Sequence, residues 1–346
     1  MNDIPSGNFR NRLAGIYSFL VAANIGAWVW ALIAFHDKPI LLGTAVLAYT
    51  FGLRHAVDAD HIAAIDNVTR KLMQDGKRPV SVGFYFALGH STVVIVAALV
   101  AYWSASTAEK HFEFLKNIGG VFSTGVSAFF LIAIALINMV ILRGVYRAFQ
   151  RARRGSYGDQ TADMLLGGGI VARLLGPLFK LLSSPWHMFP IGFLFGLGFE
   201  TATEVALLGI SASAAAKGLS LQAVMALPAL FTSGMTLVDT TDGVLMIGAY
   251  GWAFVKPIRK LYYNLTITFV SVVVALIVGG IEVIGLLKDQ LNLSGGVWDF
   301  IGCLNDNFNT LGFVIIGVFI FSWIGSMIVY RAKGFERVTP AKPAAD

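Results

Sequence analysis

Eight apolar runs of about 20 residues or more take up most of this chain of 346 residues. They lie at approximately residues 13–35, 40–66, 80–103, 118–142, 187–214, 223–251, 264–287 and 308–330. A helix of about 20 apolar residues crosses the hydrocarbon core of a bilayer, and backbone exposed to lipid must satisfy its hydrogen bonds within its own segment. The pattern therefore predicts an all-α, polytopic membrane helix bundle of eight transmembrane spans.

The positions of lysine and arginine predict the orientation of this bundle. With the N-terminus inside, 20 of the 26 basic residues fall in inner segments and five fall in outer loops. Cytoplasmic loops of membrane proteins carry such an excess. We therefore expect a multi-pass protein of a bacterial inner membrane, with both termini in the cytoplasm and lipid around it. Because the basic residues act as topology signals, the net charge of +6 does not indicate a nucleic-acid partner.

The spans are expected to form a single membrane domain. Its parts are spans 1–4 in residues 1–142, a basic cytoplasmic loop at 143–186, spans 5–8 in residues 187–330 and a cytoplasmic tail at 331–346, so that the domain covers 1–346. The one cysteine, Cys303, excludes an internal disulfide and nearly excludes thiolate metal chemistry.

An internal repeat relates the two halves of the chain. FGLRHAVDADH in span 2 and FGLGFETATEV in span 5 share the FGL triplet, and FALGH in span 3 aligns with FTSGM in span 6. The alignment pairs Gly52 with Gly196 and Gly89 with Gly234, at spacings of 37 and 38 residues. Since spans 2 and 5 run in opposite directions, spans 2–4 and 5–7 are predicted to be inverted repeats, a design typical of transporters.

Ionisable side chains lie deep inside the apolar runs, where each costs about 2.5–3.5 kcal/mol on insertion scales. They are Arg54, His55, Asp58, Asp60 and His61 in span 2, His90 in span 3, Glu200 and Glu204 in span 5, Asp239 and Asp242 in span 6, and Glu282 in span 7. Seven carboxylates thus face one fixed cation, Arg54. Such groups must contact one another, water or a cation. The excess of negative over positive charge therefore predicts a pathway for cations.

Helical spacing groups these residues further. In a regular helix His55, Asp58 and His61 share one face, whereas Asp60 points away from them. Glu200 and Glu204 share a face at i, i+4, and so do Asp239 and Asp242 at i, i+3. Imidazole ligands suit Ni, Cu, Zn and Fe, while sites made only of carboxylates suit Mg, Ca and Mn. Histidines near the midplane therefore favour a borderline transition metal.

Four segments resemble the motifs of the nickel/cobalt transporter family of secondary permeases. They are RHAVDADHI at Arg54–Ile62, LGHSTVV at Leu88–Val94, LGFETATE at Leu197–Glu204 and GMTLVDTTDG at Gly234–Gly243. His55, Asp60 and His61 fall on the fixed positions of the family's His-x4-Asp-His motif. The resemblance implies high-affinity uptake of Ni²⁺ and/or Co²⁺ without an ATPase subunit. One departure is Glu200, where the family usually has Asp.

We therefore predict a transporter, not an enzyme, that imports Ni²⁺ and/or Co²⁺ by alternating access at a midplane site. The ion is the substrate, and no permanent cofactor is expected. His55, Asp60 and His61, together with His90, are the expected ligands. The other residues expected to handle metal, line the path or carry protons are Asp58, Glu200, Glu204, Asp239 and Asp242.

Other functions remain open at this point. A permease for Zn²⁺, Fe²⁺ or Mn²⁺ would use similar ligands. An intramembrane metallohydrolase could use His55, His61 and a carboxylate, although the chain lacks a His-Glu-x-x-His motif. A metal sensor or a channel-like subunit is a further alternative.

Overall fold

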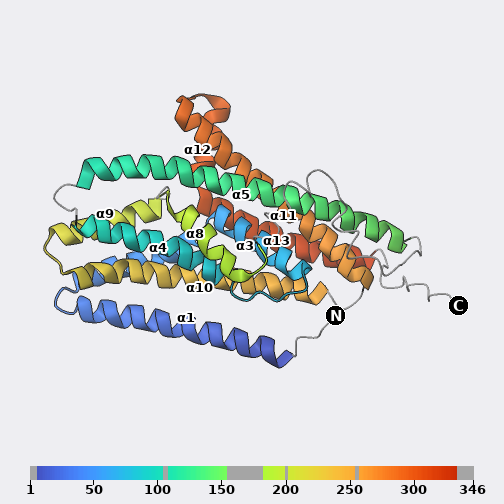
Figure 1. Ribbon diagram of the computed structural model, residues 1–346, viewed down its shortest axis with the longest axis horizontal. Coiled ribbons are helices and arrows are strands. Elements are labelled where there is room, and N and C mark those ends of the chain that lie inside the picture. The colour runs from blue at the N-terminus through green and yellow to red at the C-terminus, as the bar shows by residue number, and fades with distance from the viewer. Residues whose placement is uncertain (1–5, 104–107, 154–181, 199–201, 254–256, 333–346) are drawn as a thin grey trace.

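The computed structural model describes residues 6–103, 108–153, 182–198, 202–253 and 257–332. Every regular element in these ranges is helical (Figure 1), which confirms the all-α prediction. The helices are α1 (Ser6–Ala34), α2 (Ile40–His55), α3 (Ala59–Gln74), α4 (Val82–Trp103), α5 (Ala108–Arg153), α8 (Met188–Gly196), α9 (Ala202–Ala216), α10 (Leu221–Ala253), α11 (Pro257–Leu291), α12 (Gly296–Asp306) and α13 (Phe308–Ala332), with a short 3-10 turn at Pro185–His187.

Six of these helices are long and apolar enough to cross a membrane, namely parts of α1, α4, α5, α10, α11 and α13. The pair α2 and α3 meets the same test together and gives up to seven spans. The expected span at 187–214 is divided between α8 and α9, which have nine and 15 residues, and each is shorter than the roughly 20 residues that a span needs. The chain is a multi-pass membrane protein, but the described residues do not reach the predicted count of eight.

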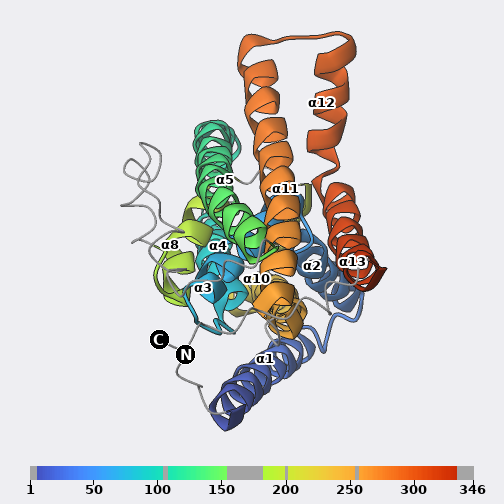
Figure 2. The ribbon, with the colours of Figure 1, turned by 90° about the vertical axis from the view of Figure 1, so that its right-hand side faces the viewer.

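Two segments differ from the expected boundaries. Helix α5 has 46 residues and continues to Arg153, although a loop was expected from residue 143. Residues 154–181 of that expected loop lie outside the described part. Helix α12 forms where an outer loop was expected, and together with the end of α11 it projects from the bundle (Figure 2). Helical structure therefore continues beyond the ends of the apolar runs.

Span 2 is broken, although the sequence suggested one regular helix over 40–66. Helix α2 ends at His55, α3 begins at Ala59, and the two axes are bent by 51°. Asp58 occupies the N-cap position of α3 with an extended backbone, at φ −63° and ψ 146°. Aspartate favours this position, but here its carboxylate pairs with His55 instead of capping the helix. The break lies against α13, where a Cβ added at Gly312 would be 1.7 Å from the Val57 carbonyl oxygen.

Helix α3 is buried on nearly all sides, although its sequence is polar. Every residue from Ala59 to Met73 except Asp60 is buried, among them Arg70 and Lys71. Helices α10, α11, α13 and α5 pack around it, and the view along the bundle places α3, α4 and α10 near the centre and α1 at the outside (Figure 2). A polar helix enclosed by apolar ones places hydrogen-bonding groups where lipid cannot reach them.

Glycines bring the central helices into backbone contact. A Cβ added at Gly52 on α2 would lie 2.1 Å from the carbonyl oxygen of Phe231 on α10. A Cβ added at Gly192 on α8 would lie 2.0 Å from the carbonyl oxygen of Phe86 on α4. Small residues allow such close approach between membrane helices. The α2–α10 pair and the α8–α4 pair are thus packed through equivalent glycine–phenylalanine contacts.

Candidate metal centre

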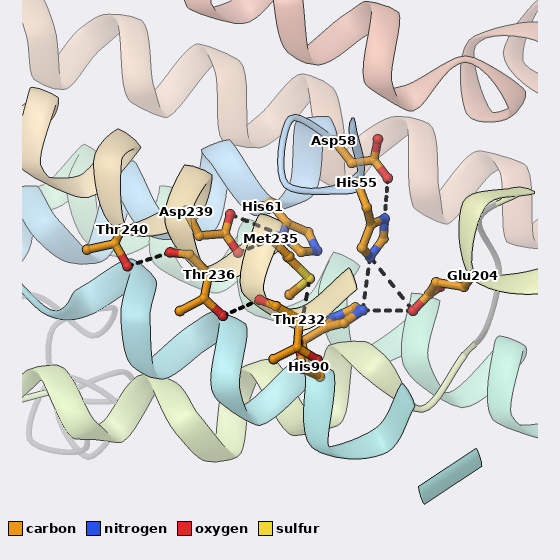
Figure 3. Close-up of polar contacts among 11 residues, drawn as sticks. His55, Asp58, His61, His90, Glu204, Thr232, Met235, Thr236, Asp239 and Thr240 are labelled. Carbon is orange, nitrogen blue, oxygen red and sulfur yellow. Dashed lines mark hydrogen bonds and ion pairs between the residues drawn. The ribbon is translucent and has the colours of Figure 1, made fainter. Parts of the chain in front are cut away.

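Three histidines from three helices meet in the interior of the bundle. His55 ends α2, His61 lies in the first turn of α3, and His90 lies in the middle of α4. All three are buried, and one ring nitrogen from each lies within 4.8 Å of the others. Figure 3 shows the rings of His55, His61 and His90 turned toward a common region. The break between α2 and α3 permits this grouping, because it places His55 and His61 on separate helix ends.

Glu204, near the start of α9, completes the cluster. Its Oε1 lies 2.8 Å from His90 Nε2 and 3.7 Å from His55 Nε2. The two Nε2 atoms of His55 and His90 are 2.9 Å apart. Two ligands at right angles on one metal, with bonds of about 2.1 Å as in zinc–imidazole sites, lie about 3 Å apart. The spacing of these ligand atoms therefore suits a single transition-metal ion.

Carboxylates contact the remaining nitrogens of two of the histidines. Asp58 Oδ2 lies 2.7 Å from His55 Nδ1, and both carboxylate oxygens of Asp239 on α10 lie 3.4 Å from His61 Nδ1. A carboxylate behind an imidazole selects the tautomer whose other nitrogen is free to bind metal, and it makes that nitrogen more basic. Both Nε2 atoms are thereby prepared as ligands.

His61 Nε2 has no hydrogen-bond partner, although it is fully buried. Buried polar atoms are seldom left without a partner, because losing contact with water costs free energy. Phe86 packs edge-on against the His61 ring at 4.8 Å, and Phe231 lies 5.7 Å from the His55 ring. These apolar walls keep water from the nitrogens, so a metal ion is the partner that the donor set fits.

The contact between the Asp58 carboxylate and the His55 ring can be tested directly. We expect Asp58→Asn to weaken metal affinity by about 10- to 100-fold, the range seen when such supporting carboxylates are lost. Asparagine is as good an N-cap as aspartate, so α3 should still begin at the same place. Equilibrium binding of ⁶³Ni²⁺ to the purified variant measures the change. Asp289→Asn, at an exposed carboxylate of α11, serves as the control, and equal affinity in both variants would contradict the role.

The structure groups some of the predicted residues and separates others. His55, His61, His90, Asp58, Glu204 and Asp239 form the cluster. Asp60 is half-buried and makes no hydrogen bond or ion pair within the described part of the chain, so its role as a ligand stays a prediction. Glu200 lies outside the described residues.

Four further side chains differ in how they relate to the histidine cluster. Asp242 is one turn further along α10 than Asp239, and its Oδ2 has no hydrogen-bond partner. Arg54 is exposed, so it does not neutralise the buried carboxylates. Phe86 and Phe231 received no role from the sequence, although each begins one of the two aligned segments of the internal repeat. That alignment was the signal that could have identified them as walls of the site.

Comparisons with known proteins agree with this chemistry. Residues 41–329 match the family model NicO, described as high-affinity nickel-transport protein. The chain is 55% identical to a high-affinity nickel transport protein of Cupriavidus necator, over 96% of this chain and 95% of the relative. It is 54% identical to the hydrogenase nickel incorporation protein HupN of Bradyrhizobium diazoefficiens, over 92% and 84%.

A cobalt transport protein, NhlF of Rhodococcus rhodochrous, is 42% identical over 94% of each chain. No solved structure matches the sequence. The family model covers most of the chain, and these relatives span nearly its whole length, so the match is not confined to one motif. This chain therefore belongs to the NicO family of high-affinity nickel-transport proteins, a family of transporters rather than enzymes.

Proposed function

We propose that this chain carries Ni²⁺ and/or Co²⁺ across the membrane through the cluster of His55, His61, His90 and Glu204. The observation that carries the proposal is the convergence of three buried imidazoles on one point, two of them with a carboxylate behind the ring. Nitrogen donors joined by a carboxylate suit Ni²⁺ and Co²⁺. The names of the nickel and cobalt relatives support the same choice of ion.

Alternating access between inverted repeats is the mechanism we infer. The contacts of Gly52 with Phe231 and of Gly192 with Phe86 support it, because each joins the first helix of one half to the second helix of the other. By these contacts Gly192 is the structural equivalent of Gly52. The alignment of the FGL triplets had instead matched Gly52 with Gly196, four residues later. In the repeat, α8 and α9 together would correspond to the broken span of α2 and α3.

Two further features support this reading of the repeat. Gly234 on α10 approaches the carbonyl oxygen of Tyr49, which lies three residues before Gly52 on α2. In the same way, Gly89 on α4 approaches the carbonyl oxygen of Phe189, which lies three residues before Gly192 on α8. In addition, α2 ends at His55 and α8 ends at Gly196, so both first helices stop near the cluster. Broken helices at the interface of two repeats are where transporters bind ions near the membrane midplane.

The orientation of the pathway across the membrane is inferred from the distribution of charge. The basic loops predict cytoplasmic termini in an inner membrane, which directs α3 and α10 from the cluster toward the cytoplasm. Lys71 and Lys77 near the end of α3 contact the backbone carbonyls of Leu182 and Ser183, and Lys71 pairs with Asp75 at 2.8 Å. We infer that metal enters from the outer side, binds at the cluster and leaves past the C-terminal half of α3.

Uptake by the purified protein tests this function. Liposomes that contain the chain should accumulate ⁶³Ni²⁺ or ⁵⁷Co²⁺ with saturation at low metal concentration, when tested with an imposed proton gradient and without one. Unlabelled Ni²⁺ and Co²⁺ should compete better than Mn²⁺, since imidazole nitrogens dominate the site, and better than Zn²⁺ or Fe²⁺, in line with the names of the nickel and cobalt relatives. Accumulation of neither metal would overturn the proposal, and stronger competition by Zn²⁺ or Fe²⁺ would reassign the substrate.

A further inference from the structure

We propose a second cation site, made only of oxygen ligands from Asp66, Thr69 and Asp242, between α3 and α10 on the inner side of the histidine cluster. It would receive the transported ion after the imidazoles and release it toward the cytoplasm. This inference rests on the proposed function, but it adds a separate site of different chemistry. None of the three residues contacts the histidine cluster directly among the hydrogen bonds and ion pairs described above.

The three side chains lie where α3 and α10 pack closely. A Cβ added at Gly243 on α10 would lie 3.5 Å from Ile65 Cγ2 and 3.8 Å from Thr69 Oγ1, both on α3. Asp242 directly precedes Gly243, and Asp66 directly follows Ile65. The carboxylates of Asp66 and Asp242 are near enough for their charges to interact. The packing thus brings two acids and a hydroxyl from facing helices into one layer, in which Asp66 and Thr69 are fully buried and Asp242 is half-buried.

Thr69 supplies an independent sign that a ligand binds in this layer. The residue is fully buried, and its Oγ1 has no hydrogen-bond partner. A helical threonine ordinarily donates to the carbonyl four residues earlier, as Thr236 and Thr240 on α10 do at 2.6 Å. Thr69 forgoes that bond and lies next to Gly243. Asp242 Oδ2 is also buried without a partner, so two oxygen atoms here are free to coordinate.

The nearby arginine bonds to an amide side chain of α3. Arg70 is among the largest fully buried side chains, and its Nη2 donates to Asn67 Oδ1 at 2.7 Å. Asn138 on α5 donates to the same oxygen, so this hydrogen-bond network joins Arg70 to α5. Nε and Nη1 of Arg70 have no hydrogen-bond partner. Because the bond that Arg70 makes goes to Asn67, the buried Oδ2 of Asp242 is left for a bound cation to offset.

Position and chemistry distinguish this layer from the histidine cluster. Asp66 is five residues beyond His61 on α3, about 7.5 Å along the helix axis and about 140° around it, so the two side chains leave the helix in different directions. Carboxylate and hydroxyl oxygens hold Ni²⁺ less tightly than imidazoles and suit Mn²⁺ and Mg²⁺ better. A weaker site beyond a stronger one lets the ion leave, since conduction through several sites requires release as well as capture.

Mn²⁺ and Ni²⁺ binding to the purified full chain in detergent can separate the two sites. Mn²⁺ is the probe for oxygen ligands, measured by loss of the free-ion electron paramagnetic resonance signal, and ⁶³Ni²⁺ is the probe for the histidines, measured by equilibrium dialysis. Asp66→Asn and Asp242→Asn should each weaken Mn²⁺ binding at least about tenfold while tight Ni²⁺ binding is kept. His55→Ala should show the opposite pattern, so each variant is the folding control for the other.

Thr69→Val supplies a variant of nearly equal size and unchanged charge. It should weaken Mn²⁺ binding several-fold with Ni²⁺ binding intact, even if the aspartate variants fold poorly. The proposal is overturned if the native chain binds no Mn²⁺, or if all three substitutions leave Mn²⁺ binding unchanged. Loss of Ni²⁺ and Mn²⁺ binding together in Thr69→Val would also overturn it, by placing both ions at one site. Failure of Ni²⁺ uptake in liposomes would instead refute the proposed function, since the binding measurements do not depend on uptake.

Discussion

Replacing His55 with alanine is expected to abolish high-affinity Ni²⁺ uptake, with a loss of at least about 100-fold in metal affinity, because a ligand is removed and not merely its support. His55 is the residue that joins the parts of the cluster. Its Nε2 faces His90 and Glu204, and its Nδ1 contacts Asp58. Radiometal uptake into cells, run with Co²⁺, Zn²⁺ and Mn²⁺ as competitors, measures the effect.

The control for this variant is His36→Ala. His36 lies just beyond the end of α1, is exposed, and contacts only the carbonyl oxygen of Ile33 and the carboxylate of Asp37 among the described residues. Its loss should leave uptake unchanged. If His55→Ala were to transport as well as His36→Ala does at equal protein levels, the buried cluster would not be the transport site.

Gly52→Ala is expected to destabilise the protein strongly and to disrupt the metal site. The added Cβ would meet the carbonyl oxygen, carbonyl carbon and Cα of Phe231 at 2.1, 2.8 and 2.9 Å, and backbone cannot rotate away as a side chain can. Overpacking of this kind typically costs about 1–3 kcal/mol and sometimes more. The shift would also separate His55, three residues later on α2, from the α4 and α9 residues that it contacts. We therefore expect a lower melting temperature in detergent together with loss of tight Ni²⁺ binding.

Gly43→Ala provides the matched control on the same helix. A Cβ added there has nothing within 4 Å, so the substitution should be neutral or slightly stabilising because alanine is the better helix former. Thermal melting and ⁶³Ni²⁺ binding of the two variants can be compared directly. If Gly52→Ala were as stable and as active as Gly43→Ala, the close contact between α2 and α10 would not be needed for the site.

The sequence could predict that the protein is a membrane helix bundle, because a bilayer permits few kinds of backbone structure to cross it. A run of apolar residues long enough to cross the hydrocarbon core must become a helix, and the runs at α4, α10 and α13 did so nearly at the predicted limits. The limits of α5 were missed, since Arg143 and Arg147 continue the helix after the apolar run has ended. Hydropathy marks which residues tolerate lipid, whereas backbone hydrogen bonding decides where a helix stops.

The grouping of His55, Asp58 and His61 was predicted from a regular helix and is found in a broken one. The three residues still meet, because the extended backbone at Asp58 turns α3 so that its first turn faces the end of α2. Asp58 itself is a local signal for the break, because aspartate favours the N-cap position of a helix. Apolar residues continue on both sides of Asp58, however, and their periodicity by itself favoured an unbroken helix.

The sequence alone determined that this chain is a membrane helix bundle, and it predicted that the intramembrane imidazoles and acids gather, since isolated charges in hydrocarbon are too costly to remain apart. Only the tertiary structure decided which groups meet. Glu204 contacts His90 and Asp239 contacts His61, across 114 and 178 residues, while Asp242 lies beside Gly243 where that glycine approaches Thr69. Such pairs depend on how glycines let α2, α4, α8 and α10 approach one another, and no spacing along a single helix contains that information.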